Sequence, residues 1–184
     1  MSSAFSAIYA AVLLPPPPII AAVNLLKQQL ADKIGPYKGL YSDAHITLCT
    51  FKATGKSLVQ WETHIQNFAN SRQALFLTFN RIACFSNGAF VLLPDEKGHE
   101  ELHCLMKSFY TNRPKGKNNT SQKAHISIAR GLNLDQQNTA QLIHNSIELS
   151  FSCNHIAIRN YNPATRLFAL KEQYDLMNTQ AEQI

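Results

Sequence analysis

The chain has 184 residues, 45% of them hydrophobic, which is enough to bury a core and suits a single domain, 1–184. Its formal net charge of +5 is compatible with an anionic partner and equally with a solvated lysine surface. The four cysteines show no Cys-x-x-Cys spacing, which excludes a disulfide framework and suits reduced thiols. The N-terminal segment has no basic signal region and no apolar run of about 20 residues. We therefore expect a soluble, cytoplasmic protein with no membrane partner.

The first half of the chain predicts the order strand, helix, strand, helix, strand. The apolar run from Tyr9 to Leu14 suits a buried strand, and the four prolines that follow can open a helix, because proline is tolerated in a helix's first turn. Val23, Leu26 and Leu30 then recur at helical spacing. In chain order, the elements of this half are expected at 9–14, 19–33, 44–48, 57–70 and 75–85.

The second half repeats this order with recognisable residues. The run Phe90–Pro94 echoes Ala11–Pro15, and each closing proline precedes a histidine by nearly the same distance, 30 positions to His45 and 31 to His125. The remaining elements of this half are expected at 97–110, 124–128, 135–147, 154–157 and 166–170.

An internal repeat, approximately 5–88 and 89–175, sets the expected architecture. It predicts an α+β fold of two pseudo-symmetric lobes, each an antiparallel sheet with outer helices, around a central cleft. A duplication can also leave a repeat with no function where its halves meet. Strand faces that carry His, Thr and Ser are poor core material unless every polar atom is satisfied, so we expect a functional groove there.

Two similar motifs carry the chemistry of this sequence. Each reads His-Ile-hydroxyl, with His45 beside Thr47 and His125 beside Ser127. Alternate residues of a strand share a face, so each histidine shares its face with a hydroxyl. Two imidazoles on either side of one phosphate can remove a proton from an attacking oxygen and protonate the departing oxygen, without a metal or cofactor, while the hydroxyls stabilise the developing charge. The motifs do not say which histidine is the acid and which the base.

Two basic residues flank the second motif. Lys123 precedes His125 by two positions and so shares its face, and Arg130 stands beside Gly131, where the chain can turn it inward to grip a phosphate. A solvated surface position is the alternative for both. Asp43 shares the face of His45 but is not included among the expected site residues.

The paired motifs resemble the twin His-x-Thr/Ser signature of the two-histidine phosphoesterase superfamily. The run from His125 to Arg130 is similar to the second motif of its 2′-5′ RNA ligase-like branch. The resemblance implies a fold of two facing lobes and opening of a 2′,3′-cyclic phosphate at a nucleotide or RNA end, with possible reversible 2′-5′ ligation. It also implies that His45 and His125 are the acid/base pair and that Thr47, Ser127, Arg130 and Lys123 bind the phosphate. We expect a monomer that acts on an RNA terminus or cyclic nucleotide.

Two alternatives belong to other classes. A catalytically silent RNA-binding module would keep the fold and the groove. A zinc peptidase would use His99 and His103 of a His-Glu-x-x-His sequence, although this motif is permissive and needs a third ligand. The basic segment 113–123 is expected to be an ordinary solvated loop, with attraction of an RNA backbone as its alternative.

Overall fold

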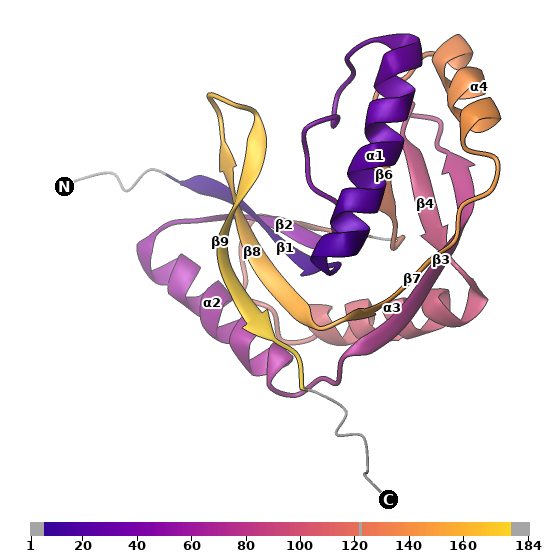
Figure 1. Ribbon diagram of the computed structural model, residues 1–184. Coiled ribbons are helices and arrows are strands. Elements are labelled where there is room, and N and C mark those ends of the chain that lie inside the picture. The colour runs from indigo at the N-terminus through magenta and orange to yellow at the C-terminus, as the bar shows by residue number, and fades with distance from the viewer. Residues whose placement is uncertain (1–5, 122, 178–184) are drawn as a thin grey trace, which may run out of the picture.

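The computed structural model describes residues 6–121 and 123–177, so the predicted start of the repeat at residue 5 lies outside the described residues. Four helices and nine strands make up this part of the chain (Figure 1). In chain order they are β1 (Ala7–Leu14), α1 (Pro17–Ile34), β2 (Ile46–Ala53), α2 (Gly55–Ala69), β3 (Leu75–Cys84), β4 (Phe90–Pro94), α3 (Glu96–Tyr110), β5 (Asn118–Thr120), β6 (Ile126–Ala129), α4 (Leu134–Ile143), β7 (Leu149–Cys153), β8 (His155–Asn162) and β9 (Leu167–Asp175).

All named strands join one antiparallel sheet. Its order is β7-β3-β4-β6-β2-β1-β8-β9, and the short β5 pairs with β2 beside this path. The two inner strands, β6 and β2, meet through a single residue pair, Ile126 and Ile46. The sheet therefore consists of two groups that barely touch, β7-β3-β4-β6 and β2-β1-β8-β9 with β5 added to β2, which confirms the predicted α+β fold with two lobes.

The two lobes have matching registers. In each, the hydroxyl residue of a motif is paired with a valine, and that valine is paired with an alanine of the next strand. The two rows are Thr47–Val12–Ala157 and Ser127–Val91–Ala83. The alanines belong to β8 and β3. The first half of the chain therefore contributes β3 to the lobe built by the second half, and the second half contributes β8 and β9 to the lobe built by the first.

The two faces of the sheet are covered differently. Trp61 of α2 stacks on Phe51 of β2, with ring centroids 4.0 Å apart, and the register places Phe51 on the face opposite Thr47. In Figure 1, α2 and α3 lie along the lower side of the sheet, while α1 and α4 pack together at the top. The face of Thr47 is thus left free of α2. None of the described helices is long and apolar enough to cross a membrane.

Several predicted elements differ from the structure: β7 was not predicted, and β8 runs to Asn162 where a strand was expected at 154–157 only. Three further differences have a clear physical reason. The helix expected at 135–147 ends at Ile143, because His144 leaves helical geometry and its buried ring lies with Nε2 3.1 Å from the carbonyl oxygen of Leu26 in α1. The segment expected to be a plain loop contains β5, since residues 118–120 find unpaired backbone along β2. The last strand continues beyond residue 170 to Asp175, because β8 offers it a partner over that whole length.

Candidate active site

Both motifs line one small cavity where the two lobes meet. Its volume is about 180 Å³, and its walls include His45 and Thr47 from the β2 side and His125 and Ser127 from the β6 side. The aliphatic residues between and beyond them are fully buried. Strand alternation therefore exposes an imidazole and a hydroxyl from each lobe, as the sequence predicts.

The two imidazoles are held in the same way. Nδ1 of His45 lies 2.7 Å from the carbonyl oxygen of Asp43, and Nδ1 of His125 lies 2.9 Å from that of Lys123. A carbonyl oxygen can only accept, so each bond places the hydrogen of a neutral ring on Nδ1. No described residue forms a hydrogen bond with either Nε2. These nitrogens are available to take or give a proton.

Arg159 of β8 is a site residue that the sequence analysis missed. Only 6% of its surface is exposed, its Nη2 donates to the carbonyl oxygen of Phe168 at 2.6 Å, and its Nη1 lies 3.0 Å from Nδ1 of His45. With the ring hydrogen on Nδ1, both atoms of this contact are donors, so it is a close approach of like groups rather than a hydrogen bond. The positive charge of the guanidinium opposes a second proton on the ring. Burial, and then the charge of Arg159, lower the pKa of His45 to about 4. The strand was expected at 154–157 only, so Arg159 fell two positions outside it.

The second lobe carries a phenylalanine where the first carries this arginine. Arg159 lies two residues beyond Ala157 and Phe85 two residues beyond Ala83, the alanines that occupy matching register positions. The ring of Phe85 meets that of His125 edge to face, with centroids 5.7 Å apart and an interplanar angle of 80°. The two histidines therefore have similar backbone partners but different neighbours, a cation for one and an aromatic ring for the other.

The structure places the two predicted basic residues differently. Arg130 lines the cavity, and its backbone N–H donates to the carbonyl oxygen of Lys38. Gly39 faces this side chain, because a Cβ at that position would lie 3.4 Å from Nε of Arg130. Lys123 is exposed and does not line the cavity; its Nζ lies 5.9 Å from the ring centroid of Phe85. The structure thus brings together five of the six predicted site residues.

Lys27 of α1 is a second residue that the sequence analysis missed. It lines the cavity with only 2% of its surface exposed, and its Nζ donates to the carbonyl oxygens of Gly39 and Ser42. Burial lowers its pKa to about 8. The ammonium group ties down the loop that carries Asp43, the backbone partner of His45. A signal was present, because Lys27 follows Val23 by four positions on the buried stripe of the predicted helix.

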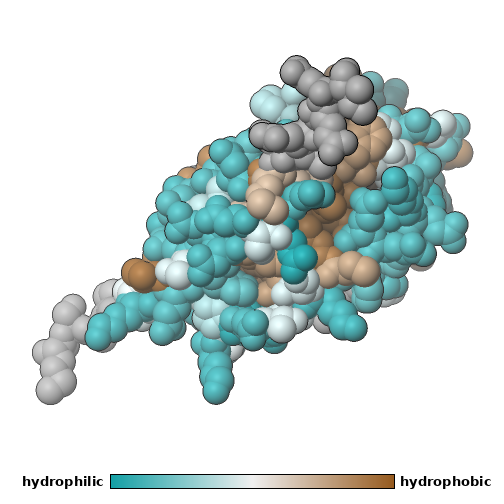
Figure 2. Space-filling model, turned by 90° about the horizontal axis from the view of Figure 1, so that it is seen from below, coloured by the Kyte–Doolittle hydropathy of each residue, from teal (hydrophilic) through white to brown (hydrophobic). Residues whose placement is uncertain are grey.

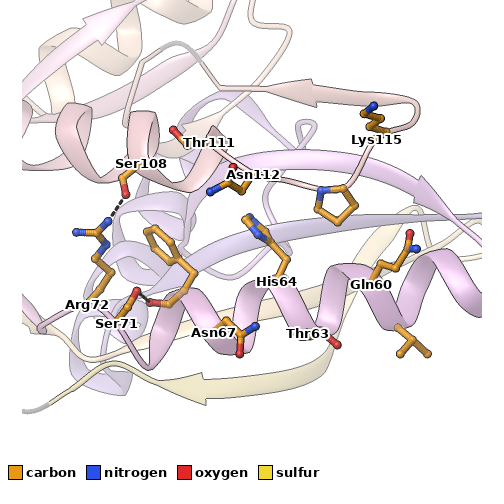
Figure 3. Close-up of a pocket in the computed structure, with 13 residues that line it drawn as sticks. Gln60, Thr63, His64, Asn67, Ser71, Arg72, Ser108, Thr111, Asn112 and Lys115 are labelled. Atoms are coloured by element: carbon orange, nitrogen blue, oxygen red, sulfur yellow. Dashed lines mark hydrogen bonds between the residues drawn. The ribbon is translucent and has the colours of Figure 1, made fainter.

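A larger cavity of about 990 Å³ lies on the opposite side, between α2 and the end of α3. Figure 2 shows this side as a hollow with a hydrophobic floor between hydrophilic flanks, and Figure 3 shows the side chains that line it. Arg72 donates to Ser108 across it, and Nε2 of His64 lies 3.0 Å from the carbonyl oxygen of Phe109. His64 is the one histidine among the lining residues. This cavity therefore lacks a pair of acid/base groups.

The His-Glu-x-x-His sequence lies at the outer surface of α3. The rings of His99 and His103 are both exposed and have centroids 6.4 Å apart. Within residues 6–121 and 123–177, no group of three or more His, Cys, Asp or Glu side chains is placed to hold a metal ion. A zinc peptidase site needs a third ligand, and this surface does not supply one.

The arrangement of lobes is shared with several solved structures. E. coli LigT complexed with 3'-AMP matches at a TM-score of 0.61 and 12% identity, over 94% of this chain and 99% of that one. E. coli LigT complexed with phosphate matches at 0.60 and 10% identity, over 94% and 98% of the two chains. TT0787 of Thermus thermophilus matches at 0.58 and 15% identity, over 94% and 99%. At these identities the likeness establishes the fold alone.

The family of this chain is identified from its sequence. No curated protein matches it. The family model of the 2'-5' RNA ligase superfamily matches residues 15–165, a stretch that includes both histidine motifs and Arg159. This match covers most of the chain and agrees with the fold of the solved phosphoesterase structures. The chain therefore belongs to the 2'-5' RNA ligase superfamily.

Proposed function

We propose that the protein is a metal-independent phosphodiesterase that opens a 2′,3′-cyclic phosphate at the end of an RNA or on a free nucleotide. With the 5′ hydroxyl of a second RNA in place of water as the nucleophile, the same ring opening forms a P–O5′ bond, releases the 3′ oxygen and leaves a 2′-5′ linkage. This agrees with the family's name and makes 2′-5′ ligation a second expected activity of the same site. The observation that carries the proposal is the convergence of both histidines and both hydroxyls on one small cavity.

His45 serves as the general base in this proposal. Its Nε2 removes a proton from water, the water oxygen forms a bond to phosphorus, and one ester oxygen of the ring departs with the electrons of the broken P–O bond. Support comes from the surroundings of this ring. Burial, and then the charge of Arg159 at 3.0 Å from Nδ1, lower the pKa of His45 to about 4. The ring is therefore neutral, with an open lone pair, at neutral pH.

His125 serves as the general acid. Its Nε2–H protonates the departing ester oxygen. His45 thus gains the proton that water loses, and His125 loses the proton that the leaving oxygen gains. Phe85 rather than a guanidinium contacts this ring, and a protonated imidazole can interact favourably with a neighbouring aromatic ring. The difference between Arg159 and Phe85 at matching positions thus supports different roles for two similarly bonded histidines.

The remaining polar groups of the cavity stabilise the phosphate. The hydroxyls of Thr47 and Ser127 donate to its non-bridging oxygens, and Arg130 adds a guanidinium that can bind two oxygens at once. That E. coli LigT has been solved with phosphate and with 3'-AMP supports an anionic ligand of this kind for a related fold. The four free thiols support a reducing compartment, in which we place the protein as a cytoplasmic enzyme.

The test is hydrolysis of 2′,3′-cyclic AMP in the presence of EDTA. Wild-type protein is expected to be active, and His45→Ala and His125→Ala are each expected to lower kcat by roughly 10²- to 10⁴-fold, the usual contribution of general acid or base catalysis. His99→Ala is the matched control and should keep full activity. Activity that requires zinc, or that survives both site substitutions, would refute the mechanism. Binding of RNA without any turnover would favour the non-catalytic module.

A further inference from the structure

A second cavity shares part of its lining with the cavity of the two histidines. Its volume is about 590 Å³, and four residues line both cavities: Ser42, Asp43, Arg159 and Phe168. It lies between the first turn of α1, the loop at 41–43 and the hairpin of β8 and β9. The two cavities are therefore neighbours, separated by no more than these shared side chains. A volume of this size is typical of small-molecule sites.

The wall formed by β9 is apolar and lies on the same face of the sheet as Arg159. Leu170 is paired with Arg159 across the strands, so their side chains share a face. Phe168 precedes Leu170 by two positions in β9 and therefore lies on the same face. Leu170 keeps 57% of its surface exposed, and Tyr41, on the opposite rim, keeps 77%. A large aromatic and a large aliphatic side chain thus stay in water on both sides of a cavity, a pattern typical of a binding surface.

The polar groups of this cavity suit a neutral ligand rather than a second anion. Arg159 is already engaged by the carbonyl of Phe168 and lies 3.9 Å from a carboxylate oxygen of Asp43, while His155 is paired with Asp175 at 2.9 Å. The other polar side chains that line the cavity are uncharged, apart from Asp43 itself, and include the amides and hydroxyls of Asn162, Thr165 and Gln173. Amides and hydroxyls can donate to and accept from the edge of a heteroaromatic ring.

We propose that this cavity binds the nucleobase of the substrate whose phosphate lies between the two histidines. The base stacks between Tyr41 and the wall of Phe168 and Leu170, with its polar edge toward the amides of the hairpin. The inference rests on the proposed function, since it places a nucleotide phosphate at the histidines. It adds that the substrate is recognised through its base and not through phosphate and ribose alone.

The test compares the affinities of two probes for the full chain by titration calorimetry in EDTA. Adenosine 2′-phosphate carries a base, and methyl ribofuranoside 2-phosphate has the same sugar and phosphate without one. Wild-type protein is expected to bind the adenosine compound at least tenfold more tightly. Tyr41→Ala and Leu170→Ala should each weaken that probe roughly fivefold or more, in keeping with the loss of a stacking partner, and leave the base-free probe unchanged. Leu142→Ala, which truncates a leucine with 79% exposure on α4, is the matched control and should change neither affinity.

Equal affinity of wild-type protein for the two probes, or equal weakening of both by Tyr41→Ala and Leu170→Ala, would overturn the base site. Because calorimetry requires no turnover, this outcome is distinct from failure of the proposed reaction. Protein that prefers the adenosine probe in this pattern but leaves 2′,3′-cyclic AMP intact would support the base site and refute the phosphodiesterase. Both variants alter exposed side chains, and far-UV circular dichroism verifies that they are folded.

Discussion

At the scale of single residues, the important feature is the different surroundings of two histidines in matching positions. Both rings are anchored through Nδ1 to a carbonyl two residues earlier in the chain. Only His45 also faces a buried guanidinium, that of Arg159, and burial and that charge both disfavour its protonated form. Two nearly symmetric lobes thus place their histidines in different electrostatic surroundings, because an arginine in one lobe occupies the position of a phenylalanine in the other.

This asymmetry predicts the acid limb of the pH–activity profile. The base must be neutral, so kcat/KM of the wild type should fall only as pH drops toward the pKa of His45, about 4. Arg159→Gln removes the nearest positive charge, raises that pKa toward the ordinary histidine value of about 6.5, and moves the limb to higher pH. Profiles of kcat/KM for 2′,3′-cyclic AMP measure the shift.

Two further variants separate charge from packing in that experiment. Arg159→Lys keeps a positive charge and should keep the limb near its wild-type position. Arg130→Gln removes a charge that lowers the pKa of His45 less than Arg159 does. It should therefore shift the acid limb of the pH–activity profile less than Arg159→Gln does. A limb that stays in place in Arg159→Gln, or that moves to lower pH, would contradict the role given to Arg159.

At the scale of elements, the turn between β3 and β4 supports the segment that follows β6. The carbonyl oxygen of Gly88 accepts from the backbone N–H of Leu132 at 2.9 Å. Gly88 has a φ of +78°, and a Cβ there would lie 2.5 Å from the carbonyl oxygen of Leu132. Only glycine allows this close approach, which holds the chain just after Arg130 and before α4.

Gly88→Ala is therefore expected to be strongly destabilising. A side chain at positive φ costs roughly 1–2 kcal/mol, and the backbone clash adds about 1–3 kcal/mol of strain. Gly35→Ala is the matched control, because Gly35 has nearly the same φ, +76°, but nothing within 4 Å of an added Cβ. Urea denaturation should show a clearly larger loss of unfolding free energy for Gly88→Ala. Equal losses for the two variants would show that the approach to Leu132 is not constraining.

At the scale of the whole molecule, the two lobes are joined more by exchanged strands than by their shared seam. The inner strands pair through Ile46 and Ile126 alone. In contrast, β3 comes from the first half of the chain and extends the lobe of β4 and β6, while β8 and β9 come from the second half and extend the lobe of β1 and β2. Neither half of the chain contains all strands of one lobe. We therefore propose that 1–184 folds as one domain.

Unfolding should accordingly be a single cooperative transition. Trp61, the only tryptophan, lies on α2 against Phe51 of β2 and reports the first lobe by fluorescence, while far-UV circular dichroism reports the helices of both lobes. The two signals should share one urea midpoint. Fragments 1–88 and 89–184, expressed separately, should both be unfolded. Two separate transitions, or a folded fragment, would show instead that the lobes are independent.

The sequence by itself determined the order of most strands and helices and the pair of histidines that line one shared cavity. These features depend on local patterns: apolar spacing separates helices from strands, and strand alternation places His45 with Thr47 and His125 with Ser127 on exposed faces. Even the exchange between lobes left the two motifs facing each other, because each lies on an inner strand.

Only the tertiary structure decided which side chains surround that pair. Arg159 follows His45 by 114 positions and Phe85 precedes His125 by 40, so their contacts depend on strand order and register rather than on local spacing. The same holds for Lys27, whose buried ammonium group is satisfied by carbonyls of a distant loop. Pairing between strands far apart in the chain is set by how the whole sheet closes, and no local periodicity records it.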